Sequence, residues 1–378
     1  MNNTNRIFLH KLFKAIADSI IKIFIPLYLL KTTGIVELSI AYLIGQSIFT
    51  FVLMFLTKKL LLKHGLLCMI LHCIPIILTQ ALFSFCKINL TIVLICSLLM
   101  AAAQTLYSIP LNILFASTDK SVNVAKFQIS TNVGKLVFIL ISGLLLSKLP
   151  DSFLYLSLLS SLFYILCIVP ILTNYKEIKT EIENNSLIIK NKRKHIEPKK
   201  ISIWYRIYHC CFGIFQITIE IVVPLFLYLN NLSFEAVTTI IVLVEAIKIC
   251  TNFVAKILVS KNKFLVCSLT STIVFIGCLI SIIFCKNPVV LYILSCLISV
   301  SFPLCFVPMF SLFCKDIKEN NSINQDMFLR DIDIFAPRPI YYSAFFLTFN
   351  FIPCLTIGFV CSVLSFISQV KARKQSNT

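Results

Sequence analysis

Charged side chains inside apolar segments are the residues of this chain best suited to chemistry. The segment 8–30 contains four of them, three or four residues apart: Lys11, Lys14, Asp18 and Lys22. This spacing places all four on one face of a helix. Ionisable residues cost roughly 2.5–3.5 kcal/mol at the centre of a membrane helix on insertion scales, and they usually face a cavity or a partner. Lys11 and Lys14 can reach the membrane surface, whereas Asp18 and Lys22 lie deeper and require partners.

The same positions recur in the second half of the chain with different charges. Residues 25–29 read Ile-Pro-Leu-Tyr-Leu and return 198 positions later as Val-Pro-Leu-Phe-Leu. Further identities at this offset are Glu37/Glu235, Lys58/Lys256, Asn89/Asn287, Ser97/Ser295 and Pro110/Pro308. At the same offset Asp18 corresponds to Gln216, and Lys22 corresponds to Glu220. The chain therefore has a duplicated scaffold whose scarce charges differ between the two copies.

The segment 234–259 holds a second acid–base combination. Glu245 and Lys248 are three residues apart, and this spacing permits a local ion pair. Buried carboxylates can also exchange protons near neutral pH, so Glu245 and Glu220 are candidates for coupling to protons.

Lys135 in the segment 127–148 and Arg338 in the segment 328–349 are cations at comparable depth in the two halves. Arg338 lies between Pro337 and Pro339, which free backbone carbonyls. A guanidinium can hold a carboxylate or phosphate through two parallel hydrogen bonds. We therefore expect Arg338 to face a cavity and to bind an anionic group.

The run before Arg338 permits a competing interpretation. Asp331 lies seven residues earlier on the same helical face, and Arg330, Asp331 and Asp333 can form a charge network near the cytoplasmic surface. We expect the network role for Arg330 and Asp333 and the cavity role for Arg338. The candidate charges nearly balance and do not establish the sign of a substrate: Lys22, Lys135, Lys248 and Arg338 against Asp18, Glu220, Glu245, Asp331 and Asp333.

Uncharged residues complete the candidate lining or join helices by hydrogen bonds. They are Gln46, Gln104, Tyr107, Asn112, Asn132, Gln216 and Asn252. Prolines that recur at the 198-residue offset, Pro26/Pro224 and Pro110/Pro308, are the strongest candidates for helix kinks.

Membrane helices must position these side chains. The 378 residues are 58% hydrophobic and 13% charged, too apolar for a water-soluble protein of this size. A membrane helix needs about 20 apolar residues. The hydropathy predicts twelve spans, near 8–30, 36–57, 66–86, 90–115, 127–148, 152–172, 203–229, 234–259, 264–285, 288–314, 328–349 and 352–370. The fold class is therefore an all-α polytopic membrane protein.

The lysines and arginines that give the net charge of +18 lie almost entirely on every second connection between these spans, and those connections are all on the same side of the membrane. Lysine and arginine remain on the cytoplasmic side, so both termini and the long basic connection are predicted to be cytoplasmic. This explains the charge without a nucleic-acid partner. The predicted organisation is a six-helix half (1–173), a cytoplasmic linker (174–202) and a second six-helix half (203–378). With six spans in each half, the two repeats enter the membrane in the same direction and are parallel.

Cysteine and histidine give no sequence signal for a metal or cofactor. Most of the 16 cysteines lie within predicted spans, where cysteine acts as a small apolar residue, and no Cys-x-x-Cys pair or histidine spacing typical of metal ligands is present. His72 and His209 are interpreted as packed residues. The sequence shows no cluster of residues with catalytic spacing. This disfavours the hypothesis that the protein is a lipid-modifying enzyme.

Two six-helix halves joined by a basic cytoplasmic loop resemble the major facilitator superfamily over the whole chain. Where that family has a loop with glycine, aspartate and arginine after its second helix, residues 57–65 read Thr-Lys-Lys-Leu-Leu-Leu-Lys-His-Gly and lack the acidic member. The Gly-Pro pair typical of drug antiporters in the fifth helix is also absent, which disfavours drug efflux. In the resembled family, the first and seventh helices face each other across the cavity.

The resemblance implies a secondary transporter of the cytoplasmic (inner) membrane that moves a small polar solute by alternating access, with an anionic solute as one candidate and protons as a candidate coupling ion. We expect a monomer in contact with membrane lipid. One hypothesis is that Lys22 and Glu220 pair in the inward-facing state and part in the outward-facing state. The alternative is an Asp18–Lys22 pair with Glu220 protonated separately. A transporter-like receptor or assembly factor without transport is the second functional class.

Overall fold

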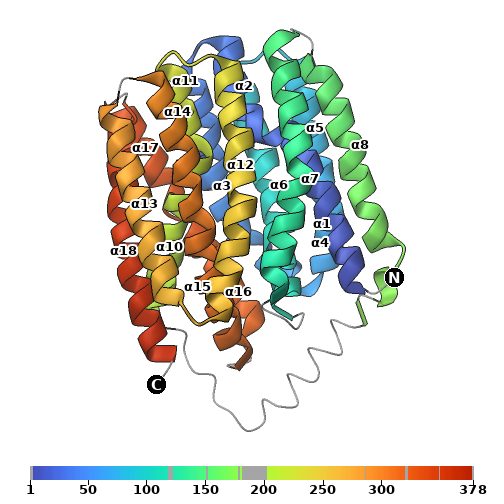
Figure 1. Cartoon of the computed structure of the whole chain (residues 1–378). Coiled ribbons are helices and arrows are strands. Elements are labelled where there is room, and N and C mark those ends of the chain that lie inside the picture. The colour runs from blue at the N-terminus through green and yellow to red at the C-terminus, as the bar shows by residue number, and fades with distance from the viewer. Residues whose placement is uncertain are drawn as a thin grey trace.

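The computed structural model describes residues 3–117, 122–149, 152–177, 179–180, 202–285, 287–319, 322–348 and 350–376. Within these ranges the chain folds into helices without β-strands. Most of the predicted linker, 174–202, lies outside the described residues. Both ends of the chain lie at one end of the helical bundle, here called the terminus side, and the other end is called the opposite side (Figure 1).

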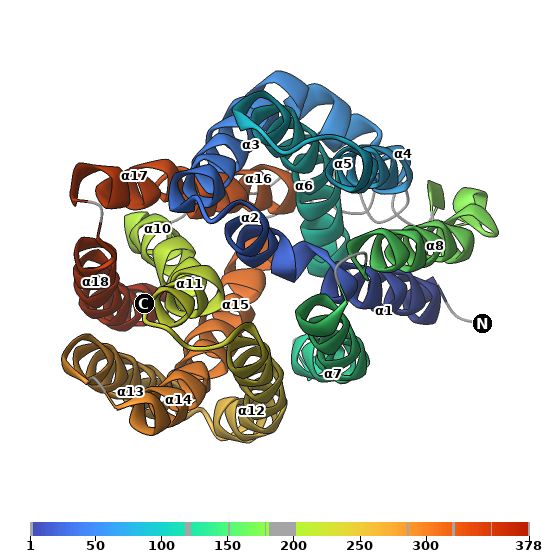
Figure 2. The same ribbon diagram turned by 90° about the horizontal axis from the view of Figure 1, so that it is seen from above.

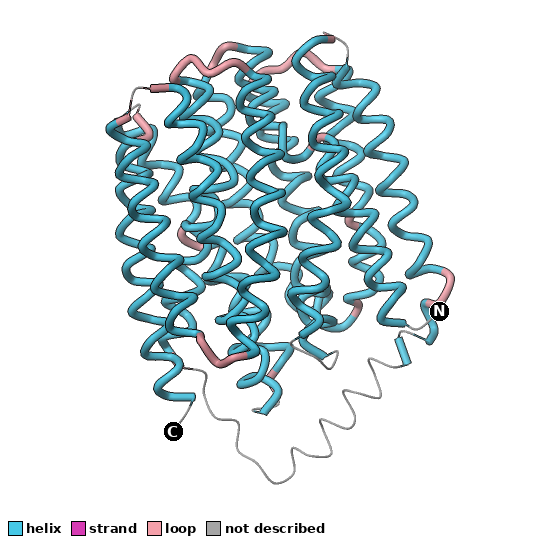
Figure 3. Tube along the Cα trace, in the orientation of Figure 1, coloured by secondary structure: helices cyan, strands magenta, loops and turns pink. Residues whose placement is uncertain are grey.

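The first half of the chain crosses the bundle six times in the described residues. The crossings are α1 (Asn3–Ile20) with η1 (Lys22–Phe24) and α2 (Ile25–Thr33), α3 (Val36–Lys63), α4 (Gly65–Leu71) with α5 (Cys73–Phe85), α6 (Leu90–Ser117), α7 (Val122–Lys148) and α8 (Ser152–Leu172). Short loops join successive crossings, and brief non-helical stretches interrupt some of them within the bundle (Figure 3).

The second half repeats this arrangement. Its described crossings are α10 (Ile203–Ile217) with η3 (Thr218–Val222) and α11 (Val223–Leu229), α12 (Phe234–Ser260), α13 (Phe264–Phe284), α14 (Pro288–Leu297) with η4 (Ile298–Val300) and α15 (Ser301–Glu319), α16 (Ile323–Phe335) with α17 (Arg338–Thr348), and α18 (Ile352–Ser376).

Ten of the described crossings are long and apolar enough to span a membrane. The other two are α1–α2 and α16–α17, which are interrupted and contain charged residues. The prediction of an all-α membrane protein with two parallel six-helix repeats is confirmed. The two crossings with the weakest apolar character are also those that contribute Asp18, Lys22, Asp331 and Arg338.

Proline explains the interruptions that recur at the 198-residue offset. Pro26 lies in the first turn of α2, directly after the 3₁₀ segment η1, and Pro224 lies in the first turn of α11, directly after the π segment η3. Proline cannot donate a hydrogen bond to the carbonyl four residues earlier, and its ring crowds that carbonyl. Pro110 and Pro308, by contrast, lie inside the continuous helices α6 and α15.

The two six-helix groups lie side by side and meet along two sets of helices (Figure 2). Helix α12 packs along α7, and α16 and α17 pack against α3 and α6. Glycine permits the close approach of α7 to α12, because a Cβ atom at Gly143 would lie 1.7 Å from Cγ2 of Thr238. These contacts leave a space between the groups that the charged crossings line.

Candidate functional site

A central cavity of about 420 Å³ lies between the two six-helix groups, a volume that accommodates a small molecule. Contacts between the groups lie on both sides of it. Phe55 packs edge-on against Phe328 on the terminus side, with ring centroids 6.4 Å apart. Phe24 packs against Phe234 at the same centroid distance on the opposite side. The cavity therefore lies between two sets of contacts that join the halves.

Most of the residues predicted for the site line this one cavity. They are Asp18, Lys22, Gln104, Lys135, Gln216, Glu220, Glu245, Lys248, Asp331 and Arg338. Gln46 and Asn112 line it as well, whereas Asn132 and Asn252 are buried elsewhere. Tyr107 does not line the cavity. Its ring lies 4.2 Å from Nζ of Lys14, and its buried hydroxyl has no hydrogen-bond partner among the described residues.

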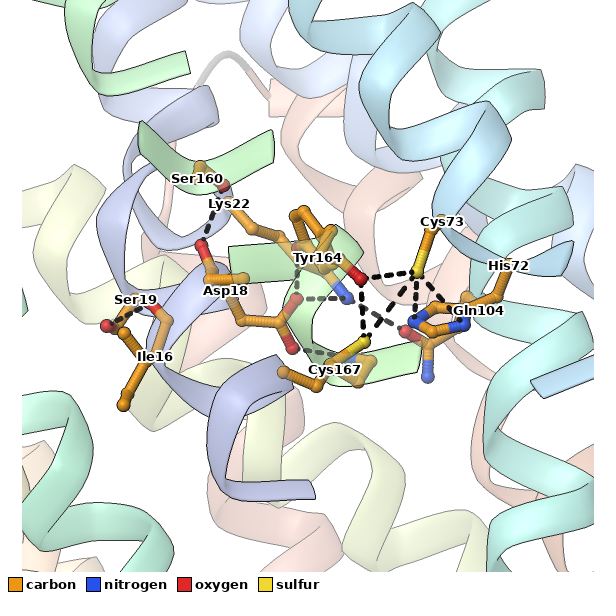
Figure 4. Close-up of polar contacts among 12 residues, drawn as sticks. Ile16, Asp18, Ser19, Lys22, His72, Cys73, Gln104, Ser160, Tyr164 and Cys167 are labelled. Carbon is orange, nitrogen blue, oxygen red and sulfur yellow. Dashed lines mark hydrogen bonds and ion pairs between the residues drawn. The ribbon is translucent and has the colours of Figure 1, made fainter. Parts of the chain in front are cut away.

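Asp18 is the centre of a polar cluster in the first half. Its carboxylate pairs with Lys14 on the same helix and accepts a 2.5 Å hydrogen bond from the Tyr164 hydroxyl of α8 (Figure 4). Lys22 lies 4.0 Å from Asp18 and donates a 3.1 Å hydrogen bond to Oε1 of Gln104 on α6. A buried carboxylate needs such partners because burial removes its hydration. Asp18 is therefore neutralised within its own half.

Lys248 is the centre of the corresponding cluster in the second half. Its Nζ lies 2.9 Å from Glu245, as the i, i+3 spacing predicted, and 3.2 Å from Glu220 on η3. Glu220 also accepts a 3.1 Å hydrogen bond from Gln216, which in turn accepts a 3.0 Å bond from Arg338. One lysine thus contacts two carboxylates, and a hydrogen-bonded chain extends from α12 through η3 and α10 to α17.

Neither hypothesis for Lys22 and Glu220 describes this conformation. Lys22 bonds to Gln104, and Glu220 bonds to Lys248, so the two do not pair with each other. The Asp18–Lys22 contact of the alternative exists at 4.0 Å, but Glu220 has a lysine partner of its own. Sequence reasoning missed Tyr164 and the Glu220–Lys248 contact because these partners lie on different helices.

Arg338 begins α17 immediately after the interruption at Ala336–Pro337. Its guanidinium lies 4.2 Å from the ring centroid of Phe335, and its buried Nε has no hydrogen-bond partner in the part of the chain that the structure describes. Its one side-chain hydrogen bond among the described residues goes to neutral Gln216. Lys135 lines the cavity from α7, and in the described part of the chain it has no hydrogen bond or ion pair. Two cations thus face the cavity without a bonded carboxylate.

The predicted charge network on α16 exists only in part. Arg330 pairs with Asp331 at 2.7 Å, and Asn112 of α6 donates two hydrogen bonds to Asp331, at 2.9 and 3.0 Å. These bonds join the two halves on the terminus side. Asp333 does not take part, because it points to the other side of α16 and forms a two-point pair with Arg206 at 2.8 and 3.0 Å. A run of residues on one helix faces several neighbours, so spacing alone did not separate these partners.

Two cysteines and a histidine that no sequence spacing linked come together in the first half. His72 and Cys73, at the junction of α4 and α5, lie against Cys167 of α8, and one ligand atom from each falls within 4.8 Å of the others (Figure 4). Cys167 is distant in sequence from the adjacent His72 and Cys73, so a search for short spacings did not find the group.

Comparison with known proteins assigns the chain to a family. The model of the Major Facilitator Superfamily matches residues 7–324, and the chain belongs to this superfamily of membrane transporters. No curated protein sequence matches it. The chain is thus a multi-pass membrane protein of a transporter family.

Solved structures with the same fold cover almost the whole chain. One is a bacterial homologue of the iron transporter ferroportin in an outward-facing state with soaked iron, with a TM-score of 0.70, 14% identity, and coverage of 99% of this chain and 100% of that chain. Another is the proton:xylose symporter XylE bound to 6-bromo-6-deoxy-D-glucose, with a TM-score of 0.68, 12% identity, and coverage of 98% and 94%. The human organic anion transporter MFSD10 has a TM-score of 0.65, 12% identity, and coverage of 97% and 98%. At these identities the likeness establishes the fold alone.

Proposed function

We propose that this protein is a secondary transporter that moves a small polar solute with an anionic group through the central cavity by alternating access. The observation that carries the proposal is the state of Arg338, which faces the cavity with a buried Nε that lacks a hydrogen-bond partner within the described ranges. An unpaired buried donor is costly, and a carboxylate or phosphate can satisfy a guanidinium through two hydrogen bonds.

The pairing of the other charges supports an anionic solute. Asp18 has Lys14, Asp331 has Arg330, and Glu220 and Glu245 share Lys248. Each of these carboxylates therefore already contacts a cationic side chain, although Glu220 and Glu245 share one. Lys135 and Arg338 remain available, one from each half, so an anion between them would contact both halves at once. A solute that bridges the halves can stabilise one arrangement of the halves relative to another.

Proton coupling is proposed for Glu220. The acid shares Lys248 with Glu245, so the three groups carry one more negative charge than positive charge. The Glu220 side chain is 36% exposed to the cavity, whereas that of Glu245 is 10% exposed. Glu220 is the better placed of the two to exchange a proton with water in the cavity.

The test is a panel of small carboxylates and phosphates, each with its neutral analogue, scored by thermal stabilisation of the purified protein. A ligand that binds only the folded state at a hundred times its Kd stabilises by about 2.7 kcal/mol. We expect stabilisation by an anionic compound and not by its neutral analogue. Arg338→Lys should weaken this binding by about tenfold or more, because a lysine cannot form the two-point contact. Arg206→Lys is the matched control, since Arg206 makes a two-point contact with Asp333 away from the cavity wall.

Equal stabilisation by the neutral analogue, or unchanged affinity in Arg338→Lys, would contradict the anionic proposal. If no small molecule binds, the result would favour the alternative of a transporter-like receptor or assembly factor. For coupling, Glu220→Gln in proteoliposomes should abolish accumulation driven by a pH gradient while exchange of solute continues. Persistent accumulation would assign coupling to another group.

A further inference from the structure

We propose that His72, Cys73 and Cys167 form a zinc site inside the first six-helix group, behind the wall of the central cavity. His72 and Cys73 lie where α4 meets α5, and Cys167 lies on α8 (Figure 4). All three residues are buried. The proposal concerns metal binding in one half of the protein and does not depend on the transported solute.

The distance between the two sulfurs agrees with tetrahedral ligation. Cys73 Sγ lies 3.7 Å from Cys167 Sγ, and it lies 3.6 Å from Nε2 and 3.7 Å from Nδ1 of His72, so the imidazole ring must turn for Nε2 to bind the same ion. With Zn–S bonds of about 2.3 Å and a Zn–N bond of about 2.0–2.1 Å, a tetrahedral angle separates two sulfurs by about 3.8 Å and a sulfur from a nitrogen by about 3.6 Å. A trigonal arrangement with the same bond length would separate the sulfurs by about 4.0 Å. The sulfur atoms are thus already spaced for a tetrahedral ion.

The histidine has the tautomer that zinc requires. His72 Nδ1 lies 2.6 Å from the carbonyl oxygen of Met69, an acceptor, so Nδ1 carries the proton and donates it. The lone pair is therefore on Nε2, which is free to bind an ion. A hydrogen bond of this kind from the second ring nitrogen orients most metal-binding histidines.

Two further buried polar groups beside the cluster lack hydrogen-bond partners among the residues that the structure describes. The Tyr107 ring packs against the His72 ring at a centroid distance of 4.6 Å, and the buried Tyr107 hydroxyl has no hydrogen-bond partner. His10 lies against both rings, with centroid distances of 5.7 Å to Tyr107 and 6.2 Å to His72, and its buried Nε2 is also without a partner. Unsatisfied groups of this kind are uncommon in folded proteins and suggest a missing ligand.

Charge and coordination number both favour a divalent ion that exchanges. Two thiolates neutralise Zn²⁺, and a neutral complex can be buried without a further counter-ion. Three protein ligands leave the fourth position open, as in zinc sites that bind water. In the metal-free cluster both thiols donate to the carbonyl oxygen of Tyr164, at 3.2 Å from Cys73 and 3.0 Å from Cys167. Zinc would replace the two thiol protons and so release the backbone carbonyl of Tyr164. The side chain of the same tyrosine holds Asp18 at the cavity wall.

The experiment is metal loading of the purified, reduced protein followed by desalting and metal analysis. We expect about one zinc per chain, falling to below about a tenth in Cys73→Ala and in Cys167→Ala, because two ligands no longer complete the site. Cys267→Ala is the matched control, since Cys267 is fully buried and lies in a separate apolar cluster, and it should retain zinc. Equal zinc content in the wild type and in both cluster variants would overturn the proposal.

A second measurement uses the unaltered protein and does not depend on the folding of variants. Co²⁺ in place of zinc should produce the intense visible absorption of tetrahedral cobalt together with thiolate-to-cobalt charge transfer. Zn²⁺ should abolish both signals by displacement. Weak absorption typical of six-coordinate cobalt would contradict the site. A Cys73–Cys167 disulfide in the purified protein, with no zinc uptake after its reduction, would show that the two sulfurs pair with each other instead.

Discussion

The first and seventh crossings come from the same repeated unit, yet they organise their charges differently. Pro26 and Pro224 interrupt both, but the interruption is a tight 3₁₀ segment in the first and a wide π segment in the seventh. In the first, the acid Asp18 gathers two lysines of its own helix. In the seventh, Glu220 contacts Lys248, which another helix supplies. A duplicated scaffold can therefore keep its bends while its charged residues take separate roles.

The largest expected effect tests this difference in charge sharing. Lys248→Met leaves Glu220 and Glu245 without a cation, and removal of one partner from a buried pair costs about 3–5 kcal/mol. Lys14→Met should cost less, because Asp18 retains Lys22 and the Tyr164 hydroxyl. Thermal unfolding of the purified variants measures both.

The control for this prediction neutralises the acids as well. Glu220→Gln and Glu245→Gln combined with Lys248→Met should recover most of the stability, since no unpaired charge remains buried. A triple variant as unstable as Lys248→Met would show that the lysine stabilises by packing rather than by charge.

The second prediction compares helix packing at equivalent positions. A Cβ atom at Gly213 on α10 would lie 2.1 Å from the backbone oxygen of Ile334, whereas the equivalent position in the first half holds Ala15. Gly213→Ala should destabilise by about 1–3 kcal/mol, as overpacking against backbone does. Gly277→Ala, with no atom within 4 Å of its Cβ, should be neutral or stabilise by up to about 1 kcal/mol. Equal thermal stability of the two variants would mean that α10 and α16 separate easily.

The third prediction asks whether the two crossings pair in another conformation. If Lys22 and Glu220 meet when one side closes, the swap Lys22→Glu with Glu220→Lys should restore transport that each single variant lowers by about tenfold, or about 1.4 kcal/mol. The matched swap Lys22→Glu with Glu245→Lys exchanges the same charges on a different helix. Rescue by the Glu220 swap alone supports the gate, and rescue by both or by neither removes it. Solute uptake in proteoliposomes measures the effect.

The smallest effect is expected at the two prolines. Pro26→Ala and Pro224→Ala should change stability by less than about 1 kcal/mol, because the surrounding helices hold the local backbone. Both should slow transport a few-fold at unchanged solute affinity if the bends allow the halves to move. Uptake rate and binding affinity measured on the same preparations separate these quantities. A loss of affinity in either variant would assign its proline to the binding site.

Sequence reasoning predicted the architecture well because its signals are local. Apolar segments of sufficient length predict helices, and the identities at an offset of 198 residues predict the repeat. It also selected residues that share one cavity, since an ionisable residue in a membrane helix needs a polar environment. Tyr107, Asn132 and Asn252 are exceptions among the selected residues. A tyrosine is equally suited to aromatic packing, and Tyr107 packs against His10 and His72.

The partners of these residues were harder to predict. Spacing within one helix identified Glu245 with Lys248, but it grouped Asp333 with Arg330 although Asp333 pairs with Arg206 on α10. Such pairings depend on the rotation of each helix and on the reach of its side chains, and neither quantity is encoded in the spacing of a single segment.

The sequence by itself determined that this chain is a duplicated twelve-helix membrane protein with a few buried charges, because hydropathy and repetition are properties of segments read one at a time. The tertiary structure decided that Asp18 bonds to Tyr164, that Glu220 shares Lys248 with Glu245, and that His72 and Cys73 meet Cys167. The physical reason is that these contacts join helices far apart in the chain, and only the packing of the helices brings their side chains within a few ångströms.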